Sequence, residues 1–329
     1  MYEKAIPEDA NLFGSAATLE GCDIAIIPVT WEATTSYGQG TSLAPQAIRK
    51  ASHQLDFFER SRGGAIDQQV FMLPIEEKWL KQSQSIQEKV QTFRKSGDSR
   101  LQEIINTDSS QLNAEVEARS LELLKLGKQI GLLGGDHSCP LGLIKALSTL
   151  FERFGILHID AHHDLRNGYE GFSGSHASIM HAVLEQVHTV ERLVSVAIRD
   201  FSQEEFERAH EDDRIVTFYD ADLHQNLADG ANWSSCCEAI LEQLPSNVYI
   251  SFDIDGLDPS LCPNTGTPVP GGLSYNQAIY LLECLGRSGK NVIGFDLCEV
   301  GVNPTTEWDA NVGARVLYQL CSLLHAAHS

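Results

Sequence analysis

The sequence predicts an α/β fold in which a mostly parallel sheet of eight strands is covered by helices on both faces. Short β-rich apolar runs recur through the 329 residues, and segments with helical periodicity separate most of the runs that follow the third one. Most of the runs are too uniformly apolar to leave one face in water. This is typical of a parallel sheet that is buried on both sides.

The predicted elements alternate along the chain. The eight strands are expected at Ile24–Thr30, Val70–Ile75, Ile130–Gly134, Gly155–Asp160, Leu193–Ile198, Ile215–Tyr219, Val248–Asp253 and Val292–Leu297. Helical periodicity is clearest in Leu141–Phe154, His176–Val190, Trp233–Leu244 and Ser274–Leu285. The long polar segment 76–129 predicts helices that cross one sheet face, interrupted at 96–99, and is interpreted as an insertion. No Pro-, Gly- or Ser-rich linker divides the chain, so one domain over 1–329 is predicted.

Composition excludes several classes of protein. The chain has 24 Lys and Arg against 45 Asp and Glu, a net charge of -21, which would repel nucleic acid and anionic membranes. The same acidity suits a cationic small molecule or divalent metal ions as partners. No secretory signal and no apolar run of about 18–20 residues is present, so a cytoplasmic protein is predicted. The eight cysteines form no CxxC pair and are expected to be buried free thiols.

Ionisable residues follow four of the predicted strands. The motifs are GGDHS at 134–138, DAHHD at 160–164, SFDID at 251–255 and DLCE at 296–299. Ligands of open parallel sheets bind beyond the carboxyl ends of the strands. These four segments are therefore expected to meet in one site.

The spacing within the motifs predicts a binuclear metal centre. Asp160, His162 and Asp164 share one side of an extended segment, as do Asp253 and Asp255. Four converging carboxylates repel one another unless cations hold them, and His137 and His162 add imidazole ligands. This oxygen-rich set favours two Mn²⁺ ions, with Fe²⁺, Co²⁺, Ni²⁺ or Zn²⁺ as alternatives, and neighbouring metals of this kind lower the pKa of a shared water. His163 falls on the opposite side and is expected to pack or to support the ligands.

These motifs resemble the ureohydrolase superfamily of arginases, agmatinases and formiminoglutamases. GGDHS, DAHHD and SFDIDGLDP stand in the family's order, and the segment from Trp31 to Ile48 is similar to the N-terminal part of agmatinase-type members. The resemblance implies a three-layer α/β/α, arginase-like fold, two Mn²⁺ ions per chain and hydrolysis of a guanidino compound to urea and an amine. It also implies a homo-oligomer, a trimer or a hexamer.

The resemblance assigns roles to individual residues. One metal would be bound by His137, Asp160, Asp164 and Asp253, and the other by Asp160, His162, Asp253 and Asp255. Glu299 would hold the guanidinium group. Asp164 would also carry a proton to the leaving amine, and His176 resembles the family's mobile proton-shuttling histidine.

The substrate is predicted from the segment Leu165–His176. It lacks the Ser-Gly-Asn context with which arginases read an amino acid and is closer to agmatinase-like proteins. Agmatine, cleaved to putrescine and urea in polyamine biosynthesis, is the favoured substrate, with Glu170 and Tyr169 receiving its ammonium group and Phe172 packing along its chain. Arg166 favours a different substrate, because its guanidinium group is suited to bind the carboxylate of arginine or formiminoglutamate. Aminopropylagmatine and guanidinobutyrate are further alternatives.

One departure and two rival functions are open at this stage. The segment Glu299–Pro304 has two more residues than many relatives, which predicts a shifted loop on the substrate side. A deacetylase-like amidohydrolase would need one Zn²⁺ and fewer carboxylates. A non-catalytic regulatory member of the family would be expected to have lost metal ligands, and here the set is complete.

Overall fold

A computed structural model describes residues 6–7, 9–59, 64–65 and 69–326 of the chain. Its main element is an eight-stranded sheet in which every pairing is parallel, in the order β4-β1-β5-β10-β9-β6-β7-β8. The strands are β1 (Ile24–Pro28), β4 (Val70–Met72), β5 (Gln129–Leu133), β6 (Phe154–Ile159), β7 (Val190–Ile198), β8 (Ile215–Tyr219), β9 (Asn247–Asp253) and β10 (Asn291–Cys298). All eight predicted strands are confirmed. A short antiparallel pair, β2 (Phe58–Glu59) and β3 (Gly64–Ala65), lies outside this sheet.

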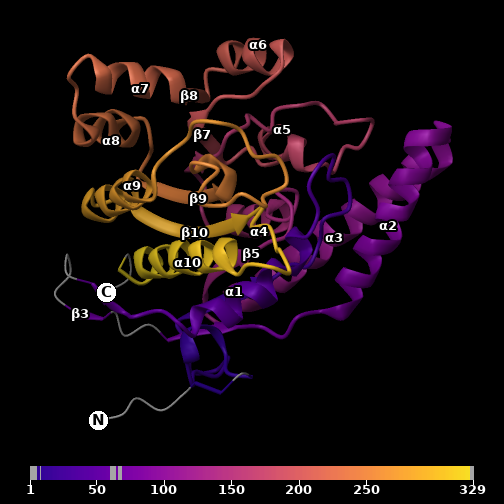
Figure 1. Cartoon of the computed structure of the whole chain (residues 1–329), viewed down its shortest axis with the longest axis horizontal. Helices are drawn as coiled ribbons and strands as arrows, with labels where there is room; N and C mark the ends of the chain where they lie inside the picture. Colours follow the sequence, from indigo (N-terminus) through magenta and orange to yellow (C-terminus); the bar gives the residue numbers. More distant parts are fainter. Residues whose placement is uncertain (1–5, 8, 60–63, 66–68, 327–329) are drawn as a thin grey trace.

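Helices fill the connections between the strands (Figure 1). They are α1 (Ala44–Ser52), α2 (Glu77–Ser96), α3 (Ser99–Lys125), α4 (Leu141–Ser148), α5 (Ile179–Gln186), α6 (Gln203–Glu211), α7 (Asp220–Ala228), α8 (Trp233–Glu242), α9 (Tyr275–Arg287) and α10 (Trp308–Ala326). Within the described residues, no helix is apolar over a length sufficient to span a bilayer.

Alternation along the strands divides the core into two halves. On β9, Val248 and Ile250 belong to one buried cluster, and Tyr249 between them belongs to the other. The first cluster takes its helical residues from α1, α7, α8, α9 and α10, and the second takes them from α2 to α6. Two helical layers therefore enclose the sheet, which confirms the three-layer arrangement.

The segment 76–129 forms a long helical hairpin, visible as the purple pair α2 and α3 in Figure 1. The predicted break at 96–99 is the turn between the two helices. Gly97 adopts a φ of 66° at the end of α2, and the Asp98 side chain accepts a hydrogen bond from Arg100 N at the start of α3. Ile86, Ile105 and Leu112 are among the hairpin residues buried against the sheet layer.

The strand order brings the four motifs together. The strands β5, β10, β9 and β6, which precede the GGDHS, DLCE, SFDID and DAHHD motifs, are consecutive neighbours in the middle of the sheet. Their registers align the ends, with Leu297 opposite Leu133 and Cys298 opposite Asp253. The carboxyl-terminal edge at the centre of the sheet therefore carries every ionisable motif found in the sequence.

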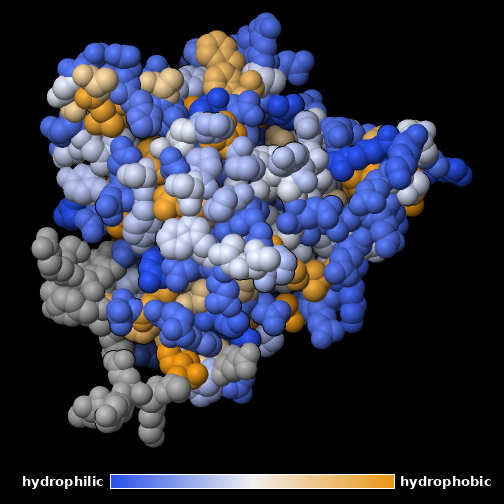
Figure 2. Space-filling model, viewed as in Figure 1, coloured by the Kyte–Doolittle hydropathy of each residue, from blue (hydrophilic) through white to orange (hydrophobic). Residues whose placement is uncertain are grey.

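The structure also bears on the predictions made for the cysteines and for the surface of the protein. All eight cysteines are free, and only Cys284 is not buried. Figure 2 shows a mainly hydrophilic face with apolar residues in small scattered groups. The N-terminal residues 1–5 and 8, part of the segment for which no secretory signal is predicted, lie outside the described residues.

Candidate active site

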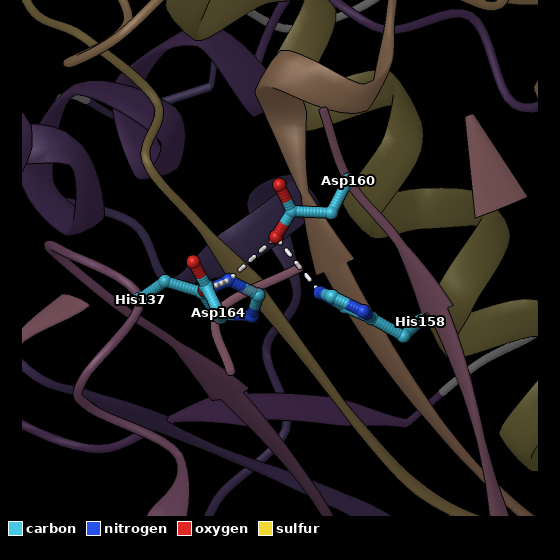
Figure 3. Close-up of side chains that lie close together, drawn as sticks. All are labelled: His137, His158, Asp160 and Asp164. Carbon is cyan, nitrogen blue, oxygen red and sulfur yellow. Dashed lines mark hydrogen bonds and ion pairs between the residues drawn. The ribbon is translucent and has the colours of Figure 1, made fainter. Parts of the chain in front are cut away.

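The six predicted metal ligands converge at the centre of the sheet edge. His137 Nδ1 lies 3.0 Å from Asp160 Oδ2, 3.0 Å from Asp164 Oδ2 and 3.3 Å from Asp253 Oδ2. Figure 3 shows Asp160 and Asp164 turned toward the His137 ring. Three carboxylates from two different strand ends thus face one imidazole nitrogen.

A second group of ligands adjoins the first and shares Asp160. His162 Nδ1 lies 3.1 Å from Asp255 Oδ2 and 3.5 Å from Asp160 Oδ1. The ligand atoms of Asp160, His162 and Asp255 lie within 4.8 Å of one another, as do those of His137, His158, Asp160 and Asp164. Two sets of oxygen and imidazole donors with a common carboxylate are suited to two neighbouring divalent cations.

The electrostatics of the cluster require positive charge. Burial, followed by repulsion from Asp255 and Asp160, raises the pKa of Asp253 well above its ordinary value. Burial and Asp160 raise the pKa of Asp164 to about 6. Burial opposes charge on His137, but the surrounding carboxylates still raise the pKa of its imidazole well above the usual range. Bound cations would remove this conflict by balancing the carboxylates directly.

The structure adds His158 to the site, a residue that the sequence reasoning missed. His158 is fully buried on β6, with Nε2 2.8 Å from Asp160 Oδ2 and Nδ1 3.1 Å from Ser195 Oγ. Figure 3 shows it on the side of Asp160 away from Asp164. The signal in the sequence was a histidine two residues before Asp160, inside an otherwise apolar strand and on the same side.

Polar residues on the neighbouring strands β9 and β10 face the second ring nitrogen of His137. His137 Nε2, the nitrogen that faces away from the carboxylate group, lies 2.9 Å from Ser251 Oγ and 3.6 Å from Asp296 Oδ1. Ligating histidines are commonly oriented through the second ring nitrogen in this way. The ring is therefore held with Nδ1 toward the candidate metal position.

Glu299 presents one carboxylate oxygen that has no hydrogen-bond partner within the described chain. Its Oε1 accepts a hydrogen bond from His137 N at 2.9 Å, and Oε2 is buried and unpaired. A Cβ atom at Gly266 would lie only 2.9 Å from Oε2, so the absence of a side chain there leaves room beside this oxygen. Burial raises the pKa of Glu299 well above its ordinary value. A buried carboxylate with a free oxygen is suited to a cationic ligand.

These groups open into a cavity of about 120 Å³. Its lining includes Glu299, His176 and Tyr169, together with five of the six metal-ligand candidates, namely His137, His162, Asp164, Asp253 and Asp255. Burial lowers the pKa of His176 to about 3, so its imidazole is neutral at pH 7. The Tyr169 ring meets the His176 ring edge-on, with centroids 5.9 Å apart.

Arg166 lines the cavity but is not a free cation. Its Nε lies 3.3 Å from Oε2 of the buried Glu205, and its guanidinium stacks over the Tyr169 ring at 4.9 Å. Glu205 also accepts hydrogen bonds from Leu165 N and Ser202 N, so it fixes two loops. The sequence reasoning missed Glu205. This residue lies in the first turn of α6 as part of a capping box, and the sequence gave no other indication that it lies near the site.

Two of the predicted substrate contacts lie away from the cavity. The Glu170 carboxylate is ion-paired with Arg94 Nη2 at 2.6 Å, and Phe172 is buried against Phe93 with ring centroids 5.2 Å apart. Neither residue lines the cavity. The substrate role of Glu170 remains a prediction that this geometry does not favour, because its charge is already balanced.

Two local predictions can be compared with the packing. His163 is fully buried between Phe201 and Tyr219, with ring centroids 5.2 and 5.7 Å away, which confirms a packing role. In the loop after Glu299, Gly301 packs directly on Asn264, and Asn303 Nδ2 donates to Asn264 Oδ1 at 2.8 Å. Glu299 lines the cavity, and the shift of this loop relative to the family stays a prediction.

Comparison with known proteins agrees with this geometry. The model of the arginase family matches residues 22–323. The chain belongs to the arginase family. It is 32% identical over 287 residues to the N(1)-aminopropylagmatine ureohydrolase of Thermus thermophilus, covering 87% of this chain and 85% of that protein. It is 28% identical over 313 residues to the proclavaminate amidinohydrolase of Streptomyces clavuligerus, covering 91% and 88%.

Solved structures confirm the arginase-like fold. The structure of the Streptomyces clavuligerus proclavaminate amidinohydrolase superposes with a TM-score of 0.76 at 20% identity, covering 99% of this chain and all of that one. The agmatine ureohydrolase of Thermoplasma volcanium superposes with a TM-score of 0.71 at 23% identity, covering 99% and 96%. The family assignment makes this arginase-family chain a hydrolase and disfavours the deacetylase-like alternative.

Replacement of the shared carboxylate is expected to weaken metal binding at both positions. We expect Asp160→Asn to reduce the divalent metal retained per chain after dialysis to less than half of the wild-type amount, because both donor groups lose a charged ligand. Elemental analysis measures the retained metal. Asp229→Asn, an exposed residue after α7, is the matched control and should retain the wild-type amount. Full retention by the Asp160 variant would contradict the assignment.

Removal of the support for Asp160 should weaken metal binding without abolishing it. We expect His158→Phe, which keeps a ring in the core, to lower Mn²⁺ affinity about 10- to 100-fold, because Asp160 loses the hydrogen bond that orients it. Competition with a metal chelator measures the affinity, and the thermal unfolding of the metal-free protein measures folding separately. An unchanged affinity would show that His158 only fills space.

Proposed function

We propose that this arginase-family chain hydrolyses a guanidino compound to urea and an amine, with agmatine, cleaved to putrescine and urea, as the preferred substrate. The observation that carries the proposal is the free Oε2 of Glu299 in the cavity that also contains the convergent ligand set. A guanidinium ion is planar and cationic, and a carboxylate is its natural hydrogen-bond partner. The cavity therefore holds an acceptor for the substrate next to residues suited to a reactive centre.

The donor set fits two divalent cations, which we propose to be Mn²⁺. His137, Asp160, Asp164 and Asp253 would hold one ion, and Asp160, His162, Asp253 and Asp255 the other. Carboxylate oxygens with few imidazoles favour this metal over softer ones. When bound, such a pair supplies an activated water as the nucleophile and a Lewis acid near the guanidinium carbon.

The chain's own residues orient the substrate and move protons. Glu299, fixed through its Oε1 by His137 N, leaves Oε2 to accept from the guanidinium N–H groups and so sets the position of the reacting carbon. Asp164 lies 3.0 Å from His137 Nδ1 beside the candidate metal position, so it is placed to carry a proton from the nucleophile toward the leaving amine. His176 lines the same cavity, and we assign to it the exchange of that proton with solvent.

The charge of the cavity supports a substrate with two cationic groups. Glu205 balances the charge of Arg166, which makes Arg166 a weaker partner for the carboxylate of arginine, guanidinobutyrate or formiminoglutamate. Asp200 lines the cavity with a side chain that is 67% exposed, and it is suited to meet an ammonium group entering from solvent. Tyr169 also lines the cavity and is suited to pack against the methylene chain.

Aminopropylagmatine is the second candidate substrate. It carries the same guanidinium group with a longer cationic tail, and the Thermus thermophilus relative is named for its hydrolysis. The Asp200 side chain is 67% exposed, so the tail of a longer substrate would extend beside it toward solvent. A place in polyamine formation, a cytoplasmic location and a homo-oligomeric state belong to this proposal as expectations from the family resemblance.

A panel of guanidino compounds tests reaction and substrate together. With Mn²⁺-loaded protein, we expect urea release from agmatine or aminopropylagmatine with kcat/KM at least about 100-fold above that for arginine or guanidinobutyrate, because an unpaired carboxylate in this acidic cavity costs several kcal/mol. A formamide readout for formiminoglutamate runs in parallel. A preference for arginine would overturn the dicationic assignment, and no release from any compound would favour a regulatory protein.

The role of Glu299 is tested by removing its charge. We expect Glu299→Gln to lower kcat/KM for the best substrate by about 100-fold or more, because the amide offers only a neutral acceptor to the guanidinium. Its Mn²⁺ content should stay at the wild-type value, since Glu299 is outside the donor set. Metal loss in this variant, or activity near wild type, would remove Glu299 from the proposed role.

A further inference from the structure

The α2–α3 hairpin holds the first loop of the cavity wall, which spans residues 32–42 and contributes Ser36 to the lining. Ser83 Oγ accepts a hydrogen bond from Glu32 N at 2.9 Å, and Gln87 Nε2 donates to Glu32 O at 2.8 Å. The Glu32 carboxylate in turn accepts from Gly40 N and Ser42 N, which closes the loop on itself. The hairpin therefore holds the base of this loop directly.

The same hairpin holds the second loop, residues 165–175, which contributes Arg166 and Tyr169 to the lining. Gln102 Nε2 donates to Gly171 O at 2.7 Å. Asn106 Oδ1 accepts from Ser173 N at 3.0 Å. Figure 1 shows the end of the hairpin beside these indigo and magenta loops. Two loops that are more than 100 residues apart in the sequence thus share one support.

Arg94, near the end of α2, contacts both loops at once. Its Nη2 donates to Thr35 O of the first loop at 3.2 Å, next to Ser36. Its Nε and Nη2 donate to Glu170 Oε2 of the second loop at 2.9 and 2.6 Å, next to Tyr169. Glu170 adopts a left-handed φ of 53°, a conformation that costs free energy unless contacts such as this pair maintain it.

We propose that Arg94 is a positioning residue for substrate, which ties the two loops together and thereby sets the distance between Ser36 and Tyr169 across the cavity. This inference rests on the proposed function. Arg94 and Glu170 are about one-third exposed, with side chains 30% and 33% accessible, so the tie lies at the rim and away from the metal ligands. Arg94 therefore acts on the outer half of the cavity, where the amine end of the substrate binds.

The proposal predicts different effects for the two members of the pair. Arg94→Gln removes both loop contacts, whereas Glu170→Gln removes only the ion pair and leaves the Thr35 contact in place. We expect Arg94→Gln to raise KM for agmatine about tenfold with kcat within about twofold of wild type, and Glu170→Gln to raise KM by a smaller factor. The Mn²⁺ content should be unchanged in both.

Hydrogen–deuterium exchange tests the tie without any substrate. Arg94→Gln should speed exchange in both 33–38 and 168–173, and Glu170→Gln only in 168–173. The double variant Arg94→Glu with Glu170→Arg should restore slow exchange in the second loop and not in the first. Arg119→Gln is the matched control, because Arg119 also lies in the hairpin and pairs with Glu76 at 3.1 Å away from both loops. It should change neither exchange nor KM.

The outcomes separate the two proposals. If wild-type protein cleaves no guanidino compound, the proposed function fails, while the exchange pattern still decides whether Arg94 ties the loops. Exchange in Arg94→Gln equal to that in Arg119→Gln would overturn the tie. A fall in kcat with unchanged KM would overturn the positioning role even where the loops loosen.

Discussion

The structure depends on one electrostatic constraint, the convergence of four carboxylates at the buried edge of a parallel sheet. Asp160, Asp164, Asp253 and Asp255 lie within reach of two imidazoles, and burial together with repulsion from Asp255 and Asp160 raises the pKa of Asp253 well above its ordinary value. Buried like charges at this separation are stable only with cations between them or with bound protons. A pair of divalent metals satisfies the constraint and also supplies a reactive centre, so stability and function depend on the same residues.

The surrounding side chains follow from the need to hold these ligands in place. His158 and Ser251 are buried polar residues inside strands, where an apolar residue would pack more favourably, and each contacts a candidate ligand. Backbone strain is concentrated in the same place. Asp164 and Glu299 both have left-handed φ values, of 54° and 61°. Such conformations are maintained by their surroundings and are commonly found at functional sites.

The part of the cavity that would bind the substrate is formed by different elements from those of the candidate metal centre. The inner half of the cavity is made by strand ends, whose positions follow from the sheet, whereas the outer half is made by two loops held by the α2–α3 hairpin. The hairpin is the segment that the sequence analysis interprets as an insertion. A change in its length or contacts would move the loops without moving the ligands, so a family of this architecture is able to vary its substrate while its chemistry stays the same.

The sequence by itself determined the sheet, the six ligand candidates, Glu299 and His176, because these signals are local. Strand periodicity, motif spacing and the position of charges at strand ends are all read within a few residues, and they do not depend on distant partners. Only the tertiary structure decided that Glu205 neutralises Arg166, that Glu170 pairs with Arg94, and that His158 supports Asp160 from beneath. The charge available to a substrate depends on which opposite charge lies beside each group. Partners separated by 39 and 76 positions along the chain are brought together only by the packing of loops and helices.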